Sequence, residues 1–133
     1  MSRVERLARA RVRSGSPFEA TIGFSRAVRV GPRVVVSGTA PVWPDGTCPD
    51  DAEVQAHRCF EIIDAALAEV GGGLGDVIRT RMFLVDRADA GAVGRAHAAA
   101  LGPAAPAASM LIVAGLLDPR WRVEIEAEAD LGG

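Results

Sequence analysis

The sequence predicts an α+β fold in which one mixed β-sheet carries two helices on one face. Segments that alternate apolar and polar residues, or that are rich in β-branched residues, occur near both ends and in the middle of the chain. Two longer segments have helical spacing and separate these strands. The order along the chain is therefore strands, helix, strand, helix, strands. This order is most simply satisfied when both helices pack on the same face of one sheet.

Length and composition fit a single domain spanning residues 1–133, in which we expect residues 1–6 to be a flexible tail. Hydrophobic residues make up 49% of the chain, enough for a core at this length. The formal net charge of -2 gives no basic field that would attract nucleic acid or a membrane surface. No run approaches the ~20 apolar residues of a membrane span, and the arginine-bearing N-terminus lacks the apolar stretch of a signal peptide. We therefore expect a cytoplasmic protein that binds neither membrane nor nucleic acid.

The first predicted strand covers residues 7–13, where arginines alternate with apolar residues. A period of two is typical of a half-buried strand. Alanine and arginine also form helices well, so a helix remains the alternative. The arginines fit a solvated face or a contact at the rim of an oligomer better than an RNA-binding tail. On one side lie Arg9, Arg11 and Arg13, and on the other Ala8, Ala10 and Val12.

A β-hairpin is predicted next, followed by a loop. Residues 27–30 and 33–36 are rich in β-branched side chains and are joined by Gly31-Pro32, which is typical of a hairpin turn. Residues 41–51 contain Pro-Asp-Gly and Pro-Asp, which are loop signals.

The first helix is the clearest element of the sequence. Asp50 or Asp51 can cap its N-terminus, and the glycines of residues 71–73 end it. Its apolar side chains recur with helical spacing and so share one face. They are Cys59, Ile62, Ile63, Ala66, Leu67 and Val70.

The second half of the chain repeats the alternation of strand and helix. We predict a strand over residues 77–85 and a second helix over residues 89–101. A loop over residues 102–106 then leads to two final strands, at residues 107–113 and 122–129.

Two features that could suggest chemistry have simpler explanations. The glycine-rich residues 71–75 follow a helix, whereas a phosphate-binding loop opens one, so a helix-to-strand turn is favoured. His57 and Cys59 point to different faces of their helix, and with Cys48 and His97 they form no known zinc spacing. We therefore expect no metal and no cofactor. We also expect the two cysteines to be free thiols and His97 to be a surface or interface residue.

Three glutamates alternate along the last predicted strand. Glu124, Glu126 and Glu128 therefore share one face of the sheet, where their like charges need compensation. Arg79 and Arg81 alternate in the same way on another strand and could pair with them across the sheet. The alternation alone favours a solvated or ion-paired sheet face.

Four short blocks, in this order, point to a known family. They read GFSRAVRVG at residues 23–31, VSG at 36–38, PAASM at 106–110 and VEIEA at 123–127. Their order and spacing resemble the signature blocks of the Rid family. These are YjgF-like reactive-intermediate (imine or enamine) deaminases, some of which were named endoribonuclease L-PSP. The resemblance extends from about residue 23 to residue 129.

The resemblance implies the chorismate-mutase-like Rid fold, a homotrimer and a ligand cleft at each subunit interface. The residues that it places in this cleft each match one position of the family pattern. They are Phe24 for the family tyrosine, Ser37 and Gly38 for its Ser-Gly, Ala108 for its carboxylate-binding arginine, Ser109 and Met110 for its Ser-Cys, and Glu124 for the glutamate that orients water.

The alanine at position 108 removes the family's anchor for a substrate carboxylate. An arginine fork binds a carboxylate through two hydrogen bonds, and Ala108 offers no such donor. Losing a charge-assisted contact of this kind costs about 2–5 kcal/mol of binding. Arg26, where many members have glutamine, could reach the cleft and partly replace the lost charge. A surface or interface arginine is the competing interpretation of Arg26.

The sequence therefore predicts a homotrimer that binds a small metabolite and possesses the glutamate needed to hydrolyse an imine or enamine. Glu124 would activate water, and backbone amides near Ser109 and Met110 would stabilise developing charge. Activity on 2-aminoacrylate is expected to be weak or absent. The alternative is a non-catalytic binding or pathway accessory protein. RNA cleavage is a weaker alternative, because two Trp, four Phe and no Tyr leave few aromatic rings for stacking bases.

Overall fold

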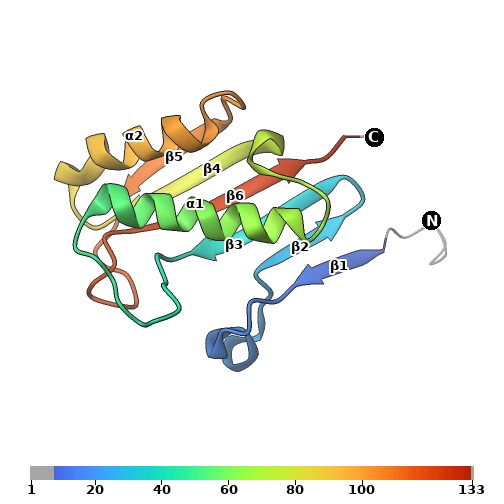
Figure 1. The fold of residues 1–133 in the computed structure, drawn as a ribbon, viewed down its shortest axis with the longest axis horizontal. Coiled ribbons are helices and arrows are strands. Elements are labelled where there is room, and N and C mark those ends of the chain that lie inside the picture. The colour runs from blue at the N-terminus through green and yellow to red at the C-terminus, as the bar shows by residue number, and fades with distance from the viewer. Residues whose placement is uncertain (1–7, 133) are drawn as a thin grey trace.

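The computed structural model describes residues 8–132 and has the predicted order of elements (Figure 1). The predicted tail, residues 1–6, and the first residue of the predicted strand 7–13 lie outside the described part. One sheet has the strand order β1-β2-β3-β6-β4-β5, and only β4 and β5 pair in parallel. Its strands are β1 (Arg9–Val12), β2 (Ala27–Val30), β3 (Arg33–Thr39), β4 (Val77–Leu84), β5 (Ala107–Ile112) and β6 (Val123–Asp130).

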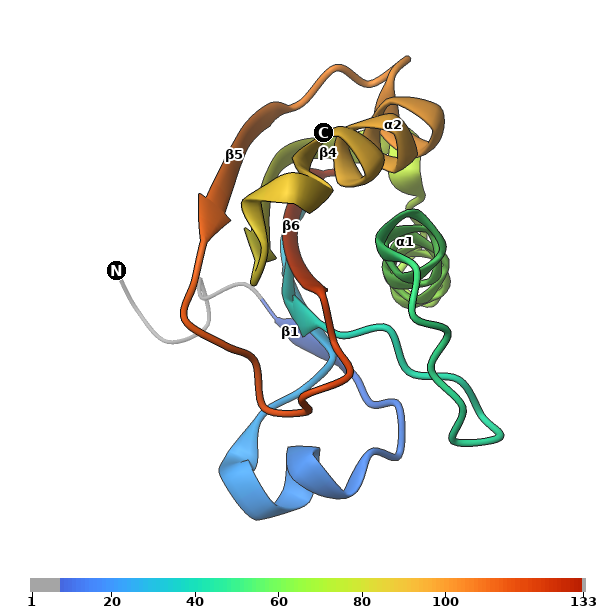
Figure 2. The ribbon, with the colours of Figure 1, turned by 90° about the vertical axis from the view of Figure 1, so that its left-hand side faces the viewer.

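Both helices lie on the same face of this mixed sheet, as predicted. They are α1 (Ala52–Ala68) and α2 (Ala90–Leu101). Figure 2, which looks along α1, shows both helices on the same side of the sheet. Neither helix of the described chain combines the length and the hydropathy needed to cross a bilayer. The structure also adds short helical turns that the sequence did not predict, among them Glu19–Gly23 between β1 and β2.

The arginine-rich segment is a strand, as its alternation predicted, and not a helix. β1 pairs antiparallel with β2, and Arg11 lies opposite Val28. Val12 is buried on the helix side, whereas Arg9 and Arg11 are exposed on the other. Because opposite residues of paired strands point to the same face, the arginines of β1 lie on the helix-free face of the sheet.

Local signals set both ends of α1. Of the two candidate caps, Asp51 is the one used, since its side chain accepts a hydrogen bond of 3.0 Å from the Val54 amide. At the other end Gly71 has a φ of 89°, in the left-handed region that favours glycine. The Gly72 amide donates to the Leu67 carbonyl at 2.9 Å, which closes the helix as a Schellman motif does.

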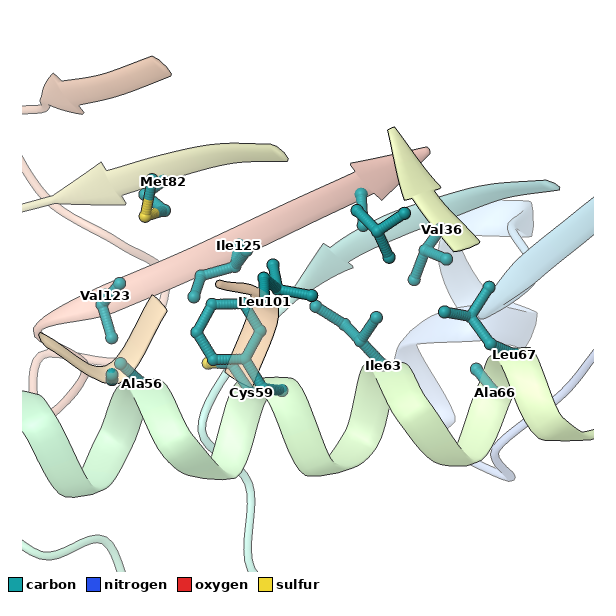
Figure 3. Packing of buried hydrophobic residues seen from close by; sticks show 14 of the residues in the cluster. Val36, Ala56, Cys59, Ile63, Ala66, Leu67, Met82, Leu101, Val123 and Ile125 are labelled. Atoms are coloured by element: carbon teal, nitrogen blue, oxygen red, sulfur yellow. The ribbon is translucent and has the colours of Figure 1, made fainter. Parts of the chain in front are cut away.

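The core fills the space between the helices and the sheet (Figure 3). Most of the predicted stripe of α1 is buried there, while Ile62 and Val70 lie at its edge and are only partly covered. Side chains of α1 meet those of α2 and of the central strands β3, β4 and β6. Figure 3 labels among others Cys59, Ile63, Leu67, Leu101, Val36, Met82 and Ile125.

The helix-free face carries the predicted pattern of alternating charges. Arg79 lies opposite Glu128 and Arg81 opposite Glu126. Arg81 Nη1 lies 3.2 Å from Glu126 Oε1, which confirms the cross-strand ion pair for this couple. Both side chains are more than a third exposed, so this pair contributes at most about 1 kcal/mol to stability.

Strand β5 forms one edge of the sheet and is exposed along its whole length. Its apolar residues Met110, Leu111 and Ile112 are 38%, 42% and 47% exposed. An exposed apolar edge strand is a ready template for pairing with another chain.

Candidate functional site

The site is built around a bulge in β3. Val36 pairs with Ala127 and Thr39 pairs with Ile125, so β3 advances three residues while β6 advances two. Ser37 and Gly38 therefore share the space opposite a single residue of β6. Such a β-bulge breaks the regular ladder and redirects nearby groups, and bulges are common next to active sites.

Gly38 makes room for the carboxyl group of Glu124. A Cβ atom at position 38 would lie 2.6 Å from Glu124 Oε2, closer than such atoms can approach. Any other residue at this position would displace the carboxylate. The Ser-Gly dipeptide and the glutamate, both predicted to belong to the site, are therefore in direct contact.

Glu124 is half-buried beside the bulge. It lies opposite Phe83 of β4, whereas Glu126 and Glu128 lie opposite arginines. No hydrogen bond or ion pair to its carboxyl group occurs within residues 8–132. Burial raises the pKa of Glu124; the nearby Arg26 charge opposes this shift and Glu126 adds to it. The carboxyl group is thus poised to exchange a proton closer to neutral pH than an ordinary glutamate.

Arg26 lies beside this glutamate. Its Nη2 donates a hydrogen bond of 2.7 Å to the Gly38 carbonyl, and its guanidinium carbon lies 5.7 Å from the centroid of the Phe24 ring. Burial lowers the pKa of Arg26, against the raising influence of Glu19 and Glu124. Its Nε is buried and has no hydrogen-bond partner in the described chain. Arg26 is therefore half-buried beside Glu124.

Ser37 ties the segment before β2 to the bulge. Its hydroxyl donates to the Ser25 carbonyl at 2.7 Å, and its amide donates to the Arg26 carbonyl at 3.0 Å. The Arg26 amide in turn donates to the Val12 carbonyl of β1 at 2.7 Å. These bonds hold Phe24 and Arg26 against the site.

The three predicted site residues on β5 do not reach Glu124 within one chain. Phe83 of β4 lies opposite both Glu124 of β6 and Leu111 of β5. Leu111 is therefore the residue of β5 that is level with Glu124. Ala108 lies further along β5, level with Thr80 and Ala127. The structure therefore brings together Phe24, Arg26, Ser37, Gly38 and Glu124, and leaves Ala108, Ser109 and Met110 apart on an exposed edge.

A hollow of about 470 Å³ adjoins the site on the β1 side, and the sequence did not indicate it. Its position depends on the pairing of β1 with β2 and on the unpredicted helical turn, neither of which a sequence pattern specifies. The only available signal was the alternation that places two arginines on one face. Its lining consists of Arg11, Arg13, Glu19, Ala20, Gly23, Phe24, Ser25, Val28 and Ser37.

The remaining candidate groups have structural roles. Cys48 and Cys59 are free thiols, as predicted, and burial raises the pKa of both, so neither is an activated nucleophile. His97 is not a plain surface residue, because its Nε2 lies 2.8 Å from Thr80 Oγ1 and its ring meets Phe60 edge-on at 5.7 Å. Within residues 8–132 no three histidine, cysteine or acidic side chains gather as metal ligands.

Comparison with known proteins gives the family. Residues 15–131 match the family model described as Endoribonuclease L-PSP. An uncharacterized protein of Streptomyces coelicolor is 42% identical over 92% of this chain and 92% of its own length. A 2-iminobutanoate/2-iminopropanoate deaminase of Salmonella typhimurium is 33% identical over 83% of this chain and 89% of its own.

Solved structures agree with the sequence relatives. The crystal structure of Rv2704 from Mycobacterium tuberculosis, a member of the YjgF/YER057c/UK114 family, has a TM-score of 0.85 and 42% identity to this chain. The match covers 92% of this chain and 99% of the Mycobacterium tuberculosis chain. The six-stranded mixed sheet with two helices on one face is therefore the fold of these relatives. The chain belongs to the endoribonuclease L-PSP family, that of the YjgF-like Rid proteins.

Proposed function

We propose that this chain forms a homotrimer that binds a small metabolite between subunits in the cytoplasm and hydrolyses an imine or enamine there. The observation that carries the proposal is the half-buried carboxyl group of Glu124, which no other side chain engages in the described chain and which lies against the glycine of a bulge. The deaminase name of the Salmonella relative supports the reaction class.

The chemistry assigns Glu124 the role of general base. It takes a proton from water as the water oxygen bonds to the imine carbon and the C=N electron pair moves to nitrogen. In the carbinolamine formed from the protonated imine, Glu124 returns this proton to the nitrogen. The C–N bond then breaks, its electron pair leaves with ammonia, and the hydroxyl group gives its proton to Glu124 as the C=O bond forms. An enamine must first gain a proton on carbon to give the imine. The raised pKa of Glu124 suits both the uptake and the return of the proton.

A second copy of the chain would complete this site. Among residues 8–132, strand β5 pairs only with β4, so its outward amides near Ser109 and Met110 are available to a ligand held by another subunit. Backbone amides aimed at developing negative charge stabilise such transition states. Some of the residues that match the family pattern form a cluster around Glu124, and the others lie on the exposed edge strand β5. A site shared by two subunits requires such a division.

The first prediction is the oligomeric state. At micromolar concentration the protein is expected to have three times the mass of one chain in light scattering. The physical reason is the apolar edge of β5, whose exposure in a single chain invites pairing with another copy. A monomer mass at this concentration would contradict the shared site.

The second prediction concerns the missing arginine. The protein is expected to hydrolyse 2-aminoacrylate, generated in situ by a lyase, far more slowly than relatives that have arginine at this position. Ala108 cannot hold the carboxylate of so small a substrate. The variant Ala108→Arg should restore activity only in part, because Phe24 and Met110 also differ from the family pattern. Turnover by the unmodified protein at the rate of those relatives would refute this anchoring argument.

A non-catalytic binder is the second candidate, and the same Ala108 favours it. The two are separated by a screen of imines generated in situ by an amino-acid oxidase, in which release of ammonia is followed with and without the protein. Acceleration for any imine supports hydrolysis. Saturable binding of metabolites without acceleration supports the binder.

A further inference from the structure

The hollow beside Phe24 has a cationic rim that the proposed hydrolysis does not use. Arg11 of β1 and Arg13, just after this strand, line it, and neither forms an ion pair within residues 8–132. The one carboxylate in the lining is already engaged: Glu19 Oε1 accepts from the Ser14 amide at 3.1 Å, and Glu19 Oε2 accepts from the Ser14 hydroxyl. Within residues 8–132, neither guanidinium group is therefore paired with Glu19 or with another carboxylate.

The rest of the lining suits the body of an organic molecule. Val28, opposite Arg11 in the sheet, contributes an apolar surface, and the Phe24 ring contributes a planar one. Ser37 adds a hydroxyl group. The lining thus combines apolar and polar groups, and about 470 Å³ lies in the usual size range of small-molecule sites.

We propose that this hollow binds the anionic end of the ligand, a carboxylate or phosphate carried on a planar apolar body, and that Arg11 and Arg13 are its anchors. Guanidinium groups bind both oxyanions through paired hydrogen bonds. This inference rests on the proposed function, because Phe24 and Ser37 join the hollow to the Glu124 site. Arg11 and Arg13 would then supply the positive charge that the family arginine supplies and Ala108 lacks.

Glu124 does not line the hollow, whereas Phe24 and Ser37 do. The hollow therefore adjoins the Glu124 site without including its carboxyl group.

The test is direct binding of three probes of similar shape to the full chain, measured by calorimetry or ligand-observed NMR. Benzoate and phenyl phosphate carry the two candidate anions, and benzyl alcohol carries none. We expect at least one anion to bind tenfold or more tightly than the alcohol, and the tighter of the two identifies the group. Arg11→Gln and Arg13→Gln should each weaken anion binding about tenfold, as expected for a lost charge-assisted hydrogen bond.

Arg9→Gln is the matched control. Arg9 lies on the same strand and the same face but outside the hollow, so its variant should bind the anions as the unmodified protein does. Equal weakening by Arg9→Gln would reveal a diffuse field and overturn the proposal. So would equal binding of the alcohol, no binding of either anion at millimolar concentration, or loss of assembly in Arg11→Gln and Arg13→Gln. Glu124→Gln should keep anion binding, so failure of hydrolysis and failure of this anchor are distinguishable.

Discussion

Glu124→Gln is expected to reduce hydrolysis of the protein's imine substrate about a hundredfold or more while leaving the assembly intact. Glutamine keeps the shape that fits against Gly38 but cannot take a proton from water. The measurement is ammonia release under saturating substrate, with light scattering on the same sample. Normal hydrolysis by the variant, or its dissociation into single chains, would refute the catalytic role.

Glu128→Gln is the control for this variant. Glu128 lies on the same strand and face but opposite Arg79, away from the bulge. It should keep full activity. If both variants lose activity equally, the loss reflects the charge of the sheet face and not a base at Glu124.

The pH dependence gives a separate test of the same carboxyl group. Burial raises the pKa of Glu124, so the active, deprotonated base is lost at a higher pH than for an ordinary glutamate as the pH falls. A raised folded-state pKa contributes stability at acidic pH that disappears as pH rises through that pKa. Glu124→Gln should therefore be at least as stable as the unmodified protein at neutral pH, and this advantage should shrink in acid.

Gln55→Ala is expected to lower the free energy of unfolding by about 2–4 kcal/mol. Gln55 is fully buried at the start of α1 and joins three backbone groups. Its Oε1 accepts from the Arg122 amide at 2.7 Å, and its Nε2 donates to the carbonyls of Pro49 and Arg120 at 2.8 and 3.0 Å. Alanine leaves these groups buried without partners and opens a cavity. Denaturant unfolding measures the loss.

Two further variants separate the causes of this loss. Gln55→Met keeps most of the volume but none of the hydrogen bonds, so it should retain most of the destabilisation if unpaired polar groups dominate. Arg122→Gln removes ion pairs to the largely exposed Asp50 and to Asp89, and should cost about 1 kcal/mol or less. A Gln55→Ala chain as stable as the unmodified protein would show that water replaces the amide at no cost.

Elements that depend on neighbouring residues could be predicted from the sequence, and pairings between distant strands could not. The stripe and caps of α1 are local, and they identified the helix and its ends. The order of the sheet, with β6 between β3 and β4, depends on contacts between segments far apart in the chain. No periodicity specifies that order.

The same limit applies to the site. Alternation placed Glu124, Glu126 and Glu128 on one face but could not distinguish them. Register does: Glu126 meets Arg81, whereas Glu124 meets Phe83 and the bulge. Only the family resemblance singled out Glu124 in advance. It gave no indication of Arg11 and Arg13, because they lie outside its blocks.

Because the site depends on the bulge at Ser37 and Gly38, it depends on the number of residues in β3 as well as on their identity. Removing one of these two residues would let β3 and β6 pair without interruption and would make the sheet more regular. The carboxyl group of Glu124 would then face an ordinary ladder, with no glycine backbone to lie against. A homologue that keeps Phe24, Arg26 and Glu124 but has a strand one residue shorter would therefore lack the site, and an insertion or deletion here matters more than most substitutions.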